Sequence, residues 1–182
     1  MIKGADTAVA GVVTLAPDVH EDERGFFLES YNERNFADAM GVAPRFVQDN
    51  HSHSVRNVLR GLHYQIERPQ GKLVRAVSGE IYDVAVDLRR SSPTFGRWTA
   101  ARLSAQNKHM QWIPEGCAHG FLVLSETADV LYKTTTYWAP EFEHVIRWND
   151  PQLAIPWPLA GEPLVSSKDA QAGPFSDAEL YP

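Results

Sequence analysis

Short runs of apolar or alternating residues, each ended by Gly, Pro or Asp, follow one another along the whole chain. Runs of this length are typical of strands and are too short for long helices. The plainest pair is residues 73–77 and 81–86, which flank Ser78-Gly79. Two apolar runs on either side of such a turn predict a β-hairpin.

A second pair of strands is expected at residues 121–124 and 130–137, joined across residues 125–129. Three consecutive threonines at 134–136 favour a strand there, because their branched Cβ atoms suit a pleated surface. Many short strands in a chain of 182 residues predict an all-β fold, an antiparallel sandwich or barrel with one or two short helices.

Only one helix is clearly indicated. Asn32 is a favourable N-cap, Glu33 suits the first turn, and Gly41 follows the last turn. The apolar fraction of 43% is enough for a core that needs no structural metal or disulfide. No repeat or linker divides the chain, so we expect a single domain over residues 1–182 with an irregular tail from about residue 151.

The net charge of −6 argues against nucleic acid or an anionic membrane as a partner, so an anionic ligand would need local cations. The single Cys117 excludes an internal disulfide and a thiolate zinc site, and fits a reducing compartment. The apolar run at residues 8–16 is short and leads into acidic residues, so we interpret it as a strand rather than a signal peptide. We expect a cytoplasmic protein.

Metal binding is the first hypothesis for the seven histidines. His51 and His53 are two residues apart, which on a strand places both on one face as half of a metal site. A surface or structural role is the simpler interpretation of this pair.

The loop Pro114-x-Gly116-x-x-His119 resembles the second metal-binding motif of cupin jelly rolls. The first cupin motif needs His-x-His, but Gln65 stands where the second histidine should follow His63. A neutral amide is a poor ligand for zinc, iron or manganese. The resemblance therefore favours the antiparallel jelly-roll fold of the cupins and argues against a metal centre.

Without a metal, His63 is available as a base, since an unperturbed imidazole has a pKa of about 6.5. Arg60, Lys72 and the cluster at residues 48–50 surround it in the sequence with more unpaired polar groups than a core accepts. Such a density of polar groups suits a pocket for a polar, anionic ligand.

Eight segments of the chain follow one another in a fixed order between about residues 10 and 170. They are Arg24-Gly25-Phe26-Phe27-x-Glu29, Gln48-Asp49-Asn50-x-Ser52, Leu59-Arg60-Gly61-Leu62-His63-Tyr64-Gln65, Gln70-Gly71-Lys72-Leu73-Val74, residues 79–89, Pro114-x-Gly116-x-x-His119-Gly120-Phe121, Tyr132-Lys133 and Ser167-Lys168-Asp169. Together they resemble the dTDP-4-dehydrorhamnose 3,5-epimerase family, and the consistent spacing of so many motifs makes the resemblance specific.

The resemblance implies epimerisation at C3 and C5 of dTDP-4-dehydro-6-deoxy-D-glucose to dTDP-4-dehydro-L-rhamnose, without a cofactor. Both carbons adjoin the C4 ketone. Each C–H is therefore acidic, because loss of its proton gives an enolate. By resemblance His63 is the base and Tyr132 is the acid, and Asp169 orients the imidazole and stabilises its charged form. Lys72 is the family's candidate for stabilising negative charge on the C4 oxygen.

The resemblance also implies a set of contacts with the nucleotide sugar. The matching positions are Arg24, Glu29, Gln48, Asp49, Asn50, Arg60, Lys72, His119, Glu143 and Lys168. The cations among them suit a pyrophosphate. Tyr137 or Phe26 is a candidate to stack on thymine. In the family the N-terminal strands pair with a partner subunit, so a homodimer is expected.

Two local features of the sequence can be interpreted fully only with a structure. Arg60 and His63 would face opposite sides of an unbroken strand, and Gly61 between them suggests a bulge that restores a common side. His144-Val145 stands where smaller residues are expected in the family, which bears on the nearby pocket wall.

Three alternative functions are left open by the sequence. An epimerase of this kind can invert one carbon only or act on a related deoxysugar, and counting the carbons that exchange deuterium distinguishes these cases. A non-catalytic module that binds nucleotide sugars and a metal-dependent cupin enzyme are the other two.

Overall fold

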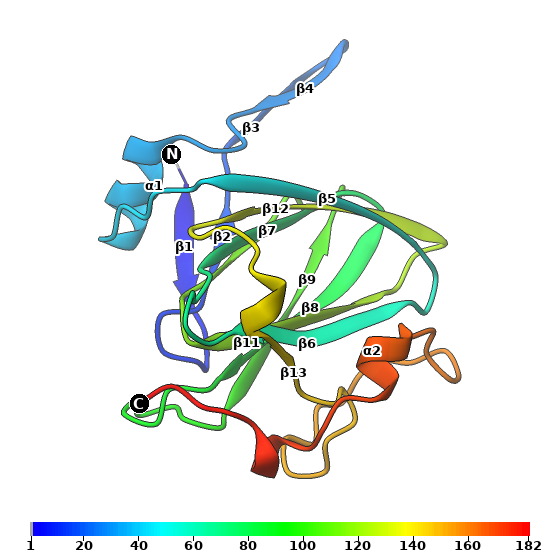
Figure 1. Cartoon of the computed structure of the whole chain (residues 1–182). Coiled ribbons are helices and arrows are strands. Elements are labelled where there is room, and N and C mark those ends of the chain that lie inside the picture. The colour runs from blue at the N-terminus through cyan, green and yellow to red at the C-terminus, as the bar shows by residue number, and fades with distance from the viewer. Residues whose placement is uncertain (1) are drawn as a thin grey trace.

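The computed structural model describes residues 2–182, and most strands form two antiparallel sheets that pack face to face (Figure 1). The large sheet has the order β1-β2-β10-β7-β12-β5, and the small sheet has the order β13-β6-β11-β8-β9. The strands are β1 (Lys3–Asp6), β2 (Val13–Ala16), β3 (Val19–Asp22), β4 (Gly25–Leu28), β5 (Gln48–Val55), β6 (Leu59–Gln65), β7 (Lys72–Ser78), β8 (Glu80–Asp87), β9 (Trp98–Ser104), β10 (Met110–Ile113), β11 (Cys117–Val123), β12 (Thr127–Thr134) and β13 (Glu143–Val145). The expected all-β antiparallel sandwich is confirmed.

Neither of the two expected hairpins forms. β7 leads into β8 through Gly79, but β7 pairs with β10 and β12, whereas β8 pairs with β9 and β11 in the other sheet. β11 and β12 likewise lie in different sheets. The pairing prediction was wrong because residues 83–87 of β8 are all buried. A strand that is covered on both faces has no alternating pattern, so its sequence does not indicate which strand it pairs with. The chain therefore crosses between sheets at these turns, as in a jelly roll.

The expected helix is confirmed as α1 (Glu33–Met40). The Asn32 side chain accepts backbone hydrogen bonds of the first turn, and Gly41 ends the helix with a φ of 67°. Phe36 is fully buried and contacts Trp112 of β10, with 5.5 Å between the ring centroids. The helix thus covers part of the outer face of the large sheet.

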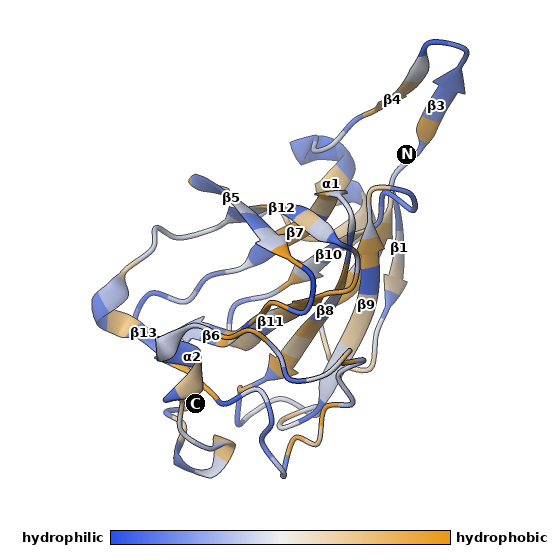
Figure 2. Cartoon of the chain, turned by 90° about the vertical axis from the view of Figure 1, so that its right-hand side faces the viewer, coloured by the Kyte–Doolittle hydropathy of each residue, from blue (hydrophilic) through white to orange (hydrophobic). Residues whose placement is uncertain are grey.

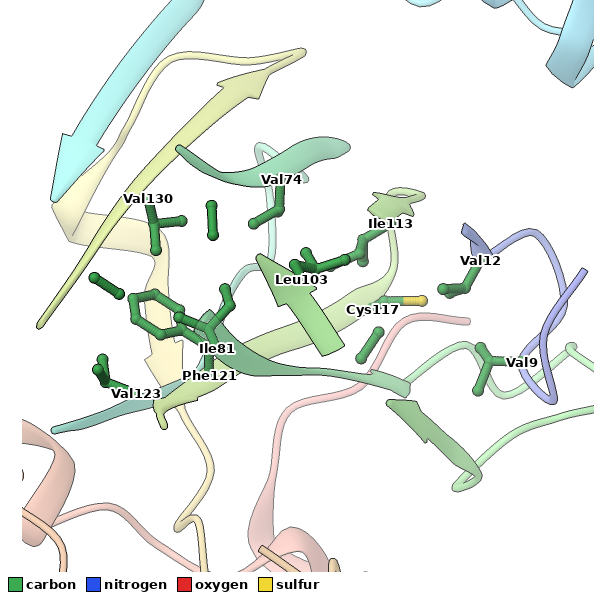
Figure 3. Close-up of a cluster of buried hydrophobic side chains, with 13 residues drawn as sticks. Val9, Val12, Val74, Ile81, Leu103, Ile113, Cys117, Phe121, Val123 and Val130 are labelled. Atoms are coloured by element: carbon green, nitrogen blue, oxygen red, sulfur yellow. The ribbon is translucent and has the colours of Figure 1, made fainter. Parts of the chain in front are cut away.

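The main core lies between the sheets, where Val74 and Val130 of the large sheet meet Ile81 and Phe121 of the small sheet (Figure 3). A second apolar cluster lies on the outer face of the small sheet. The tail beyond residue 151 covers that face with Trp157 and Phe175, among other residues. Outside the sheets are α2 (Ser167–Ala170) and the 3-10 turns η1 (Pro140–Phe142) and η2 (Phe175–Asp177).

The β3–β4 hairpin extends away from both sheets (Figures 1 and 2). Phe26 and Phe27 on this hairpin are 56% and 70% exposed. In the apolar run at residues 8–16, the expected strand is present only as β2, and residues 8–11 form a turn. In the described part of the chain, no helix has the length and apolarity needed to cross a bilayer.

Candidate active site

The β6 strand is irregular at Gly61. His119 of β11 pairs with His63, whereas Phe121 pairs with Arg60, so three residues of β6 span two residues of β11. Gly61 has a φ of 116°, and a Cβ there would lie 2.6 Å from the backbone of β11. The expected bulge is confirmed.

A cavity of about 330 Å³ opens beside this bulge and is lined by Val58, Leu59, Arg60, His63, Glu143, Leu164, Val165, Ser166, Lys168 and Asp169. The bulge thus lets Arg60 and His63 reach one cavity. Glu143, Lys168 and Asp169, which come from distant parts of the sequence, join them there. Five of the predicted site residues are therefore brought together.

His63 and Asp169 form a close pair, with 2.6 Å between His63 Nε2 and Asp169 Oδ1. Asp169 is 3% exposed. Burial by itself would raise the pKa of Asp169, but hydrogen bonds from His63, from the Gly61 backbone and from Ser166 bring that pKa below its ordinary value. Asp169 is therefore an anionic group held against the His63 imidazole.

Lys72 and His119 form a buried polar layer inside the sandwich. Burial lowers the pKa of Lys72 to about 8, against the opposing charges of Glu143 and Asp83. His119 Nε2 lies 2.7 Å from Asp83 Oδ1, and burial lowers the pKa of His119, so that this imidazole is neutral near pH 7. Within residues 2–182, the buried Asp83 Oδ2 has no hydrogen-bond partner.

Tyr132 faces the interior from β12, where it packs against the core between the sheets. Burial raises the pKa of Tyr132; Arg60 opposes this effect and Glu143 adds to it. The phenol is therefore protonated at neutral pH. Tyr132 is not one of the residues that line the cavity beside His63, although Arg60 and Glu143, which affect its pKa, both are.

The cluster at residues 48–50 is divided by the pleat of β5. Gln48 Nε2 donates to Asn50 Oδ1 over 2.9 Å. Asp49 is exposed and pairs with Lys133 over 2.9 Å. Because side chains alternate along a strand, Asp49 points to the face opposite Gln48 and Asn50.

Arg24 and Glu29 are not brought to the cavity within one chain. Arg24 lies on the β3–β4 hairpin, where its side chain is 84% exposed and pairs with Asp22. Glu29 instead accepts a hydrogen bond from Asn32 at the start of α1, over 2.9 Å. Neither residue lines the cavity beside His63.

His51 and His53 share one face of β5, as expected, and both contact Asp129 Oδ1, over 2.9 and 3.1 Å. In the part of the chain that the structure describes, no three His, Cys, Asp or Glu side chains are arranged to hold a metal ion. Gln65, at the position of the second cupin histidine, uses its amide for three hydrogen bonds to backbone groups. That amide is therefore not free to act as a ligand.

His144 does not line the cavity; it stacks on Tyr64, with 5.4 Å between the ring centroids. Its larger side chain is thus accommodated outside the cavity wall. The two candidates for stacking on a base, Tyr137 and Phe26, are both exposed.

Three contacts of the site residues escaped sequence reasoning. Asp83 hydrogen-bonds to His119. A carboxylate inside an apolar run could have indicated that a buried polar partner was needed there. Ser54 accepts hydrogen bonds from Arg60 over 3.1 and 3.0 Å. Trp138 is 58% exposed and its side chain helps to lower the pKa of Glu143, which no local pattern indicates.

Residues 6–177 match the family model described as dTDP-4-dehydrorhamnose 3,5-epimerase. The chain belongs to this family. A dTDP-4-dehydrorhamnose 3,5-epimerase from Pseudomonas aeruginosa is 60% identical over 181 residues, which cover 100% of both chains. One from Mycobacterium tuberculosis is 40% identical over 97% of this chain and 89% of the relative. The protein is therefore an isomerase of cupin-type fold.

Solved structures of the family superpose closely. The epimerase of Legionella pneumophila, in complex with dTDP-4-keto-L-rhamnose, has a TM-score of 0.97 at 47% identity and covers 100% of this chain and 98% of that one. A 3'-monoepimerase from Streptomyces bikiniensis, in complex with dTDP-quinovose, has a TM-score of 0.88 at 34% identity and covers 93% and 86%. The fold is thus common to enzymes that differ in how many carbons they invert.

Proposed function

We propose that the protein epimerises C3 and C5 of dTDP-4-dehydro-6-deoxy-D-glucose, giving dTDP-4-dehydro-L-rhamnose in dTDP-L-rhamnose biosynthesis, with no cofactor. The observation that carries this proposal is the 2.6 Å contact between His63 Nε2 and Asp169 Oδ1 at the cavity. The carboxylate fixes one ring nitrogen, and Nδ1 takes the proton from the substrate.

Each inversion is one proton removal and one proton return. His63 takes the proton from C3 or C5, and the electron pair of that C–H bond moves into the ketone to give an enolate at the C4 oxygen. The Lys72 ammonium stabilises this charge. Tyr132 donates a proton to the opposite face of the carbon and is reprotonated from solvent, and His63 releases the proton that it took to solvent before the next inversion. His63 and Tyr132 come from opposite sheets, which suits the use of opposite faces of the sugar.

The pyrophosphate is held by cations at the cavity. Arg60 and Lys168 both line it, and Glu143 pairs with Lys168. A guanidinium can meet phosphate oxygens in bidentate fashion, which favours Arg60 as the main contact. The exposed aromatic rings of Tyr137 and Trp138 are available for the thymine.

We propose a homodimer in which each β3–β4 hairpin joins the partner. Phe26 and Phe27 are exposed on this hairpin, and β5 is an edge strand of the large sheet. An unpaired edge and an extended apolar hairpin are complementary surfaces. Such pairing would carry Arg24 and Glu29 to the other subunit's cavity.

We also propose a cytoplasmic location. Cys117 is a buried free cysteine, and burial raises its pKa to about 12, as expected of a packed thiol in a reducing compartment. Detection of the protein in the membrane or periplasmic fraction of its host would contradict this.

Solvent deuterium exchange tests the reaction. Chelator-treated enzyme mixed with the substrate in D2O should introduce deuterium at both C3 and C5, read by NMR. If deuterium enters neither C3 nor C5, the proposal is wrong.

A second candidate is an epimerase that inverts only one of the two carbons, favoured by the similarity to a 3'-monoepimerase. Deuterium at a single carbon would select it. A non-catalytic binding module predicts that His63→Ala leaves ligand binding intact and that the wild type exchanges nothing. A stoichiometric transition metal by elemental analysis would favour a metal-dependent enzyme.

A further inference from the structure

Residues 137–139, here called the rim segment, follow β12 and are held by two glutamine side chains. Gln65 Nε2 donates to the carbonyl of Tyr137 over 3.3 Å, and Gln65 Oε1 accepts from the N–H of Ala139 over 2.9 Å. Between these two contacts, the N–H of Trp138 donates to Gln48 Oε1 over 3.1 Å. Each residue of the rim segment is thus tied through its backbone.

The Gln65 side chain is itself rigidly placed. It is 2% exposed, and its Nε2 also donates to the carbonyl of Arg68 over 2.7 Å. The hydroxyl of Tyr181 donates to the backbone carbonyl of Gln65. Because Gln65 lies two residues after His63 on β6, both side chains point to the same face of the strand.

The rim segment leaves its two aromatic side chains exposed, next to a residue that lines the cavity. Its backbone is held while Tyr137 and Trp138 remain 64% and 58% exposed. The Trp138 side chain helps to lower the pKa of Glu143, so the two side chains are neighbours. Glu143 lines the cavity with His63 and lies directly opposite Gln65 in the β13–β6 register. The backbone of Trp138 is therefore held directly from β5 by Gln48 and on either side from β6 by Gln65, while its ring lies near Glu143 of β13.

We infer that Gln65 is a positioning residue for substrate binding, whose amide holds the rim segment so that Trp138 lies against Glu143 at the cavity. This inference rests on the proposed function, because the bound group is the nucleotide end of the sugar nucleotide. The position requires two N–H donors and one acceptor on a single side chain, which an amide supplies and a carboxylate or thioether does not. The same strand then orients the base and the binding rim.

Gln65→Met tests this with little change in side-chain volume. We expect the KM for the substrate and the Kd for dTDP to rise about tenfold, since three buried hydrogen bonds are lost. The kcat should change by less than about threefold, because the His63–Asp169 pair is untouched. Gln111→Met is the matched control: Gln111 is fully buried, and within residues 2–182 its amide has no hydrogen-bond partner, so the Kd for dTDP should not change.

Gln65→Glu provides a second variant that keeps the shape. Its carboxylate would face the carbonyls of Arg68 and Tyr137, so dTDP should bind more weakly at pH 8 than at pH 6, where a proton restores one donor. The wild type measured at both pH values corrects for other titrations. An equal ratio of Kd values in variant and wild type would count against the inference, even if Gln65→Met fails to fold.

Trp138→Ala completes a double-mutant cycle. If Gln65 acts through Trp138, the double variant should bind dTDP no more weakly than Trp138→Ala alone. Additive losses, or an unchanged Kd and KM in Gln65→Met, would overturn the inference while the wild type still exchanges deuterium. A wild type that exchanges none would instead remove the proposed function.

Discussion

At the scale of the residue, burial decides the charge of Lys72. Its pKa is lowered to about 8, so it is an ammonium at pH 7 and loses its charge within the accessible pH range. If that ammonium stabilises the enolate, kcat/KM should fall as the pH rises above about 8. A pH profile measures this fall. In Lys72→Arg, which stays charged, the remaining activity should show no fall between pH 8 and 9.

The same burial has a cost in stability. The pKa of Lys72 is lower in the folded protein than its ordinary 10.5. Burial of the ammonium therefore destabilises the fold fully below pH 8, and this destabilisation disappears as the pH rises from 8 to 10.5. Lys72→Met should therefore raise the free energy of unfolding at pH 7 by about 1–3 kcal/mol while it lowers activity. Urea unfolding measures the difference. A variant less stable than the wild type at pH 7 would contradict this.

If Asp169 acts through His63, as we propose, its effect should appear in rate rather than binding. Asp169→Asn removes the carboxylate charge that lies against the imidazole, so kcat should fall about 10²–10³-fold while the Kd for dTDP stays near that of the wild type. Asp129→Asn is the control, because Asp129 contacts His51 and His53 outside the cavity. An equal loss of kcat in both variants would refute a specific role for Asp169.

At the scale of the element, β6 carries His63, which we propose as the base, together with Arg60 and Gln65, and its bulge depends on Gly61. Gly61→Ala would place a Cβ 2.6 Å from the Cα of Gly120 and 2.7 Å from the carbonyl oxygen of His119, in a backbone conformation with φ of 116°. Backbone atoms cannot move away cheaply, so we expect a loss of about 3 kcal/mol or more in stability, together with activity. Thermal unfolding and deuterium exchange measure the two effects.

Gly173→Ala is the control for that substitution. A Cβ at Gly173 meets no atom within 4 Å, so its melting temperature and activity should match the wild type. If Gly61→Ala behaved as Gly173→Ala does, the bulge would not need a glycine.

At the scale of the whole molecule, Arg24 lies on the extended hairpin and does not line the cavity of its own chain. If the hairpin completes the partner's cavity, mixing inactive Arg24→Ala and His63→Ala dimers with subunit exchange should restore about a quarter of the sites. Each mixed dimer then has one intact site. Activity assays before and after exchange measure this, and no recovery in verified mixed dimers would show that Arg24 acts within its own chain.

The tail beyond residue 151 also belongs to this scale. Trp157 and Phe175 pack with Leu62 and Leu122 in one apolar cluster on the small sheet. Asp169, which contacts His63, lies in the same tail. These contacts support the single domain that we propose for residues 1–182.

Local sequence determined the features that depend on neighbouring residues. Asn32 and Gly41 bound α1 because caps act within one turn of backbone. The odd spacing of Arg60 and His63 around Gly61 indicated the bulge for a similar reason. Family resemblance added the pairing of His63 with Asp169, which no spacing along the chain shows.

Only the tertiary structure decided which strands pair and which polar groups meet. β7 and β8 are adjacent in sequence but belong to different sheets, and Asp49 faces away from its neighbours in the predicted site. Asp83 finds His119, and Gln65 finds the rim segment, across strands that sequence patterns do not join. Turn, cap and bulge preferences act on a few consecutive residues, whereas pairing and burial depend on contacts between distant ones, and those exist only once the sheets have packed.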